Sequence, residues 1–83
     1  MRHILFTLKE CPRYLLDDEA HIRESLVAAA ILAESTLLDL SSHKFDPQGV
    51  TAVALLAESH ISIHTWPEKG MACLLYTSDA ADE

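Results

Sequence analysis

The chain has 83 residues, 49% of them hydrophobic, and a formal net charge of −7. This composition excludes a disordered chain and predicts one small globular domain. The charge argues against nucleic acid or an anionic membrane as a partner, and no apolar run is long enough for a membrane span. No export leader opens the chain, so we expect a cytoplasmic protein whose two cysteines are free thiols.

The first half of the chain predicts a strand followed by a helix. Residues 3–9 are apolar, with β-branched and aromatic members, and predict the strand. Pro12 breaks this strand because it has no amide hydrogen to donate to a sheet. Asp17 or Asp18 can cap a helix expected from about residue 18 to 34. Its apolar stripe must pack on a sheet and consists of Ile22, Leu26, Ala29, Ala30 and Ala33, widened by Val27 and Ile31.

Three further strands are expected after the helix. Residues 36–44 alternate, and 45–49 contain the Pro and Gly of a turn. Residues 50–57 form the most apolar strand, and residues 61–66 form the last, which Pro67 ends. In the 36–44 strand one face is predicted to hold Leu38, Leu40 and Ser42, and the other Leu37, Asp39, Ser41 and His43. In the 61–66 strand one face is predicted to hold Ile61, Ile63 and Thr65. The other face is predicted to hold His60, Ser62, His64 and Trp66.

These elements predict an α+β fold in the order β-α-β-β-β, with one helix on one face of an antiparallel sheet. Residues 73–83 are set apart, because they resemble a translated reading frame of a transposase adaptor used in DNA libraries. We therefore expect a domain over 1–72 and a non-native tail over 73–83. The alternative is a native strand followed by an acidic end.

The run from Glu58 to Glu68 concentrates reactive side chains. The Ser59 hydroxyl can attack the carbonyl of Glu58, which replaces the amide by an ester. Loss of the serine α-proton then expels the Glu58 carboxylate, and the new N-terminus hydrolyses to a pyruvoyl group. His64 can move the protons and Thr51 can hydrogen-bond an intermediate, while strain near residues 57–61 would assist. Each residue also has an ordinary structural interpretation.

A metal site is not favoured by the histidine spacing. His60 and His64 share a strand face but stand about 13 Å apart at 3.3 Å per residue. His43 could join one of them, yet no cysteine or acidic residue has ligand spacing. We therefore predict no metal.

The segments 43–50 and 57–70 resemble the prokaryotic pyruvoyl-dependent S-adenosylmethionine decarboxylases, and residues 2–5 fit the family's start. The resemblance covers about residues 2–72. It implies that a proenzyme cleaves between Glu58 and Ser59 and that Ser59 becomes the pyruvoyl cofactor. His64 matches the processing histidine, and Thr51 stands where the family usually has a processing serine.

The resemblance also implies a substrate and an assembly. S-adenosylmethionine would bind the pyruvoyl group as a Schiff base and lose carbon dioxide, giving the aminopropyl donor of spermidine synthesis. Glu68 and Phe45 match positions that line the substrate site, through carboxylate–ribose and ring-packing contacts. Two protomers would form an αββα sandwich, a homodimer in which both build the sites.

One departure from the family concerns its proton-donating cysteine. By spacing it should fall near Asp79, inside the adaptor-like segment, and Cys73 comes too early. The family's second helix and final strand are also missing, so we expect a truncated chain with little decarboxylation. Two alternatives stay open: an arginine or ornithine decarboxylase of the same fold, and a non-processing domain that binds a partner at its sheet edge.

Overall fold

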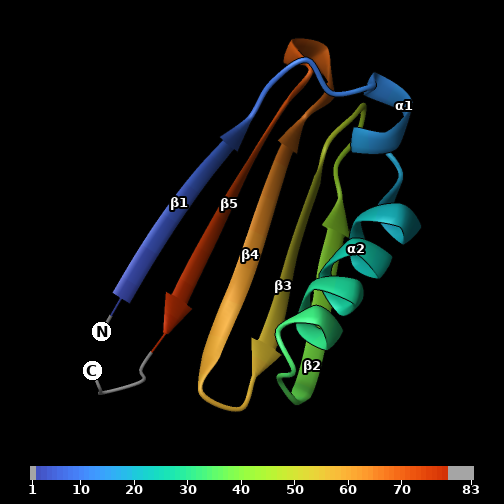
Figure 1. Ribbon diagram of the computed structural model, residues 1–83. Coiled ribbons are helices and arrows are strands. Elements are labelled where there is room, and N and C mark those ends of the chain that lie inside the picture. Colours follow the sequence, from blue (N-terminus) through green and yellow to red (C-terminus); the bar gives the residue numbers. More distant parts are fainter. Residues whose placement is uncertain (1, 79–83) are drawn as a thin grey trace.

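The computed structural model describes residues 2–78, which form a five-stranded antiparallel sheet with its helices on one face (Figure 1). The strand order is β1-β5-β4-β3-β2. The elements are, in chain order, β1 (Arg2–Leu8), α1 (Arg13–Leu16), α2 (Glu19–Leu32), β2 (Leu37–Lys44), β3 (Val50–Leu56), β4 (Ser59–Trp66), the 3₁₀ helix η1 (Pro67–Lys69) and β5 (Met71–Ser78). This confirms the α+β class and the helix on one sheet face.

Helix α2 begins where its sequence predicts and packs through part of the predicted stripe, because Ala33 is its exposed C-cap. The Asp18 side chain accepts a hydrogen bond from the His21 amide at 3.1 Å and caps the helix. The buried residues of α2 are Ile22, Leu26 and Ala30, and Ala29 packs against them. The helix lies against β2 and β3 (Figure 1). Ile31, expected to widen the stripe, is instead 69% exposed.

The alternation of strands β3 and β4 sets the two faces of the sheet. The core face is apolar and buried, and its members on these strands are Val50, Ala52, Ala54, Leu56, Ile61 and Ile63. Thr65 shares that face, where its hydroxyl donates to the Leu16 carbonyl and accepts from the Val50 amide, both at 2.8 Å. The predicted face assignment of β4 is confirmed by this burial pattern.

The predicted face assignment of β2 is wrong at its start. A register irregularity lies between Leu37 and Asp39, where β2 pairs with β3. Such a bulge adds a residue to one strand and changes which face the preceding residue meets. Leu37 therefore packs against the core together with Leu40, although the alternation placed these two on opposite faces.

A strand that was not in the predicted order completes the sheet. Residues 71–78 form β5, which pairs with β1 on one side and β4 on the other. Residues 73–78 of this strand belong to the predicted non-native tail over 73–83. Residues 79–83 lie outside the described residues. Leu74 and Tyr76 of β5 pack against the buried core.

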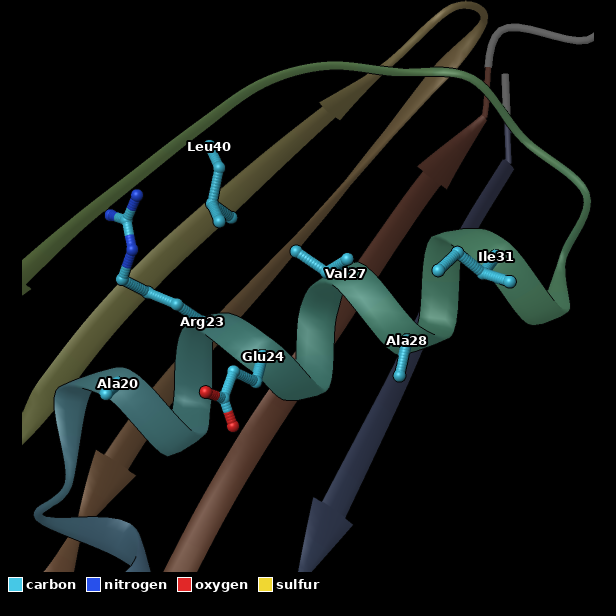
Figure 2. A pocket seen from close by; sticks show the side chains of 7 residues that line it. All are labelled: Ala20, Arg23, Glu24, Val27, Ala28, Ile31 and Leu40. Atoms are coloured by element: carbon cyan, nitrogen blue, oxygen red, sulfur yellow. The ribbon is translucent and has the colours of Figure 1, made fainter.

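The outer side of α2 forms a shallow groove with β2 (Figure 2). Val27 and Ile31 line it with Leu40, and Arg23 stands at one end. The Arg23 guanidinium donates to the Ser42 hydroxyl at 2.7 Å, and that hydroxyl donates to Glu19. The described part of the chain contains no helix long and apolar enough to cross a membrane.

Candidate functional site

The six site residues expected from the sequence fall into two groups. Thr51, His64, Phe45 and Glu68 lie around one hollow of about 380 Å³, whose lining is completed by Gln48, Gly49, Thr65 and Trp66. Glu58 and Ser59 lie instead in the β3–β4 hairpin, at the end of the sheet opposite η1 (Figure 1).

The first group is organised by a hydrogen bond between neighbouring strands. Thr51 and His64 are register partners in the β3–β4 ladder. The Thr51 hydroxyl and His64 Nδ1 are 2.9 Å apart. Because one ring nitrogen of His64 is engaged, its orientation is set and Nε2 is left to meet a reacting group. The pair can therefore hold or move a proton on the sheet face that α2 does not cover.

Aromatic and acidic groups surround this pair. The Trp66 and His64 rings lie 6.2 Å apart, and the Phe45 ring packs edge-on to His43 at 4.6 Å. Glu68 belongs to η1, which follows β4 directly. A flat apolar group could lie against these rings while the carboxylate accepts hydrogen bonds from hydroxyls.

Gln48 and Trp66 have no role in the sequence predictions, yet both line this hollow. The signal for Trp66 was its position two residues after His64, which puts both side chains on one strand face. Gln48 belongs to a turn, where periodicity carries no information about direction. Its amide adds a donor and an acceptor to the lining.

The second group lies at a break between strands. Glu58 is in the two-residue bend after β3, and Ser59 is half-buried as the first residue of β4. Ser59 lines two hollows, one with His3, His60 and Thr77 and the other with Ser35, Tyr76 and Ser78.

The backbone of this junction contains no left-handed residue, and the strain expected there stays a prediction. Within residues 2–78, the positive φ angles occur at Glu10, Glu34, Gly49 and Gly70. None of these lies between residues 57 and 61. The bend is held by an ordinary bond in which the Ala57 amide donates to the Thr36 carbonyl at 3.1 Å.

The structure does not bring Ser59 and His64 together within one chain. They are five residues apart on β4, which corresponds to about 16 Å at 3.3 Å per residue. An odd spacing also directs their side chains to opposite sheet faces. The nucleophile and the proton carrier of one chain therefore belong to different ends of the sheet.

Two further sequence predictions concern cysteine and metal. The position near Asp79, where the family's cysteine was expected, lies outside the described residues. Cys73 is the register partner of His64 across β4–β5, and its sulfur lies 3.8 Å from the Thr7 hydroxyl. No group of three or more potential metal ligands occurs within residues 2–78, and the absence of a metal stays a prediction.

Comparisons with known proteins agree with one another. A family model described as S-adenosylmethionine decarboxylase matches residues 2–81. The S-adenosylmethionine decarboxylase proenzyme of Synechococcus sp. (strain WH7803) is 55% identical over 73 residues, which cover 88% of this chain and 57% of that protein. The proenzyme of the same name from Methanococcus vannielii is 51% identical, with 88% and 60% covered.

A solved structure extends the similarity to three dimensions. The crystal structure of the adenosylmethionine decarboxylase from Aquifex aeolicus VF5 has 41% sequence identity and a TM-score of 0.84. The match covers 95% of this chain and 66% of that one. The chain thus spans about three fifths of the length of the curated relatives it matches.

Proposed function

The chain belongs to the S-adenosylmethionine decarboxylase family, and on that premise we propose that it is part of a self-cleaving proenzyme. Cleavage occurs between Glu58 and Ser59, and Ser59 becomes the pyruvoyl group. The assembled enzyme removes the carboxyl group of S-adenosylmethionine and so supplies spermidine synthesis. A cytoplasmic location stays a prediction.

The observation that carries this proposal is the position of the cleavage bond. It lies between the bend after β3 and the first residue of β4. Cutting there separates two strands that stay paired through five register partners from Thr51–His64 to Leu55–His60. The cut therefore leaves the sheet intact and leaves the new end of β4 at two hollows. A half-buried serine at a strand end fits a group that must meet a small substrate.

A pyruvoyl group supplies an electrophilic carbonyl that binds the substrate amine and accepts the electrons released with carbon dioxide. The residues of the chain bind and orient the substrate. Phe45 and Trp66 offer ring faces to the adenine, and Glu68 accepts hydrogen bonds from the ribose hydroxyls. The Thr51–His64 pair holds a proton near the reacting atoms.

The proposal includes a homodimer, because Ser59 and His64 cannot meet within one chain. A twofold arrangement of two sheets, packed on the face away from α2, can bring the β3–β4 end of one chain to the His64 end of the other. Because the Ser59 side chain points to the α2 face, it would reach that site around the end of β4, of which it is the first residue. Each site would then take residues from both protomers.

The adaptor-like character of residues 73–83 is also a proposal. It is supported by the sequence resemblance of all eleven residues. Reading the source DNA beyond the codon of Ala72 tests it, because native coding sequence there would contradict it. If it holds, the 83-residue chain will show little decarboxylation, since the proton-donating cysteine is not supplied.

Intact mass spectrometry of the purified chain tests self-cleavage. We expect two fragments that separate before Ser59, and the Ser59→Ala variant should stay whole. Ser62→Ala is a matched control, because Ser62 lies on the same strand and has no part in the proposal. An intact chain after long incubation, with a version of full family length also intact, would instead favour a non-processing domain. No comparison favours arginine or ornithine as the substrate.

A further inference from the structure

Residues 11–17 contact two turns that border the hollow around His64. One turn is the end of η1, and the other is the turn between β2 and β3. The Cys11 amide donates to the Gly70 carbonyl at 2.9 Å, which fixes the end of η1. At the other end of the segment, the Asp17 carboxylate accepts a hydrogen bond from the Gly49 amide at 2.8 Å. Helix α1, at the same end of the sheet as η1, lies between these two contacts (Figure 1).

Asp17 has a different role from its neighbour Asp18. Asp18 caps α2, whereas Asp17 follows α1 and points to the turn between β2 and β3. The same Asp17 oxygen also lies 2.9 Å from the Lys44 ammonium group. These two donors, the Gly49 amide first and Lys44 second, lower the pKa of Asp17 below its usual value. The carboxylate is therefore held in its charged form and joins the turn to the end of α1.

The turn itself has little freedom to move once this bond is made. The Phe45 amide donates to the Gly49 carbonyl at 2.8 Å and closes the turn. Gly49 has φ +112°, and a Cβ there would lie 3.4 Å from the Thr65 carbonyl oxygen. The turn is therefore packed on β4 and anchored through Gly49 on both sides.

We propose that Asp17 is a positioning residue for the substrate hollow. Its bond to Gly49 holds the turn that carries Phe45 and Gln48 against the wall formed by Trp66 and Glu68. Asp17 touches no substrate and acts only through the turn. This inference rests on the proposed function, because the hollow is taken as the site of S-adenosylmethionine.

Three variants of the 83-residue chain separate this role from a general loss of stability. Asp17→Ala removes the acceptor, whereas Asp17→Asn keeps an oxygen that can accept from the Gly49 amide. Asp18→Ala is the matched control, because it makes the same charge change one residue away and removes only the α2 cap. Calorimetric titration with S-adenosylmethionine gives binding, and amide hydrogen exchange gives the protection of Gly49.

We expect Asp17→Ala to weaken binding about tenfold and Asp17→Asn about two- to threefold, from the loss of a charge-assisted bond. Of the three variants, only Asp17→Ala should make the Gly49 amide exchange faster. Asp18→Ala should lower the melting temperature and leave binding unchanged.

The two proposals fail in different ways. Unchanged binding in Asp17→Ala, while Phe45→Ala and Glu68→Gln weaken it, would overturn the positioning role. Unchanged binding in all of these variants, or no binding by the unaltered chain, would overturn the assignment of the hollow. In that case Gly49 exchange still decides the role of Asp17 in the turn, because unchanged protection in Asp17→Ala contradicts it.

Discussion

At the scale of single residues, the hydroxyl of Thr51 sets the orientation of His64. Replacing Thr51 by Val keeps the shape and removes the bond of 2.9 Å to Nδ1. A neutral hydrogen bond contributes about 1 kcal/mol, so we expect self-cleavage to slow about fivefold to tenfold. A time course of fragment masses measures this rate.

Thr51→Ser is the conservative partner of that variant, because it keeps the hydroxyl. Its rate should stay close to that of the unaltered chain. His64→Ala removes the proton carrier itself and should slow cleavage by about 100-fold. Equal rates for Thr51→Val and Thr51→Ser would show that the hydroxyl has no part in processing.

The lowered pKa of Asp17 also predicts how the stability of the chain depends on pH. Its pKa in the folded chain is lowered, so its contribution is present above the usual value of 3.8 and is lost as pH falls through the folded value. The chain should therefore be more stable than Asp17→Asn near about pH 6, and the difference should vanish near about pH 2. Urea unfolding of both chains across that range measures it, and a constant difference would contradict the assignment.

At the scale of elements, the packing of α2 on β2 and β3 rests on a few side chains. Leu26 is only 1% exposed and lies in the middle of the buried stripe. Leu26→Ala leaves a cavity and should cost about 3 kcal/mol of unfolding free energy. Leu32, on the same helix, is 83% exposed, so Leu32→Ala should change stability by less than about 0.5 kcal/mol. Similar losses for both in urea unfolding would contradict this packing.

Local patterns predicted most of these elements, because they follow from spacing along the chain. The alternation of β4 and the cap at Asp18 are examples. Leu37 was assigned to the wrong face because a bulge depends on the pairing of β2 with β3, which spacing does not show. Strand β5 is absent from the predicted order because residues 73–83 resemble adaptor sequence and are excluded from the predicted domain.

The candidate site could be predicted only in part for a related reason. Thr51 and His64 come from different strands, and only the β3–β4 register makes them partners. Ser59 and His64 are close in sequence, but the strand period separates them in space. The sequence predicts Asp17 only as a possible helix cap, because nothing local connects it to Gly49, 32 residues away.

At the scale of the whole molecule, the described chain leaves sheet surface open on both sides. Strand β1 lies at the sheet edge far from α2 (Figure 1). It carries exposed large apolar side chains: Ile4, Leu5, Phe6 and Leu8. This chain spans 57% of the length of the Synechococcus relative. On the face away from α2, the row of Thr51 and His64 is available to a second copy.

The composite site of the proposed dimer predicts complementation between two inactive chains. Ser59→Ala keeps His64, and His64→Ala keeps Ser59, so neither should cleave efficiently alone. When the two are unfolded together and refolded as an equal mixture, about half of the dimers contain one of each chain. Such a dimer has one site with both residues, and there the His64→Ala chain should be cut.

The masses of the fragments identify which chain was cleaved. Only fragments of the His64→Ala chain are expected, at a level set by the fraction of mixed dimers, and dilution that separates the dimers should abolish them. If the mixture stays whole while the unaltered chain cleaves, Ser59 and His64 act within one chain. Because their positions on β4 keep them apart, that result would require β4 to rearrange before cleavage, and the dimer would then not be needed for processing.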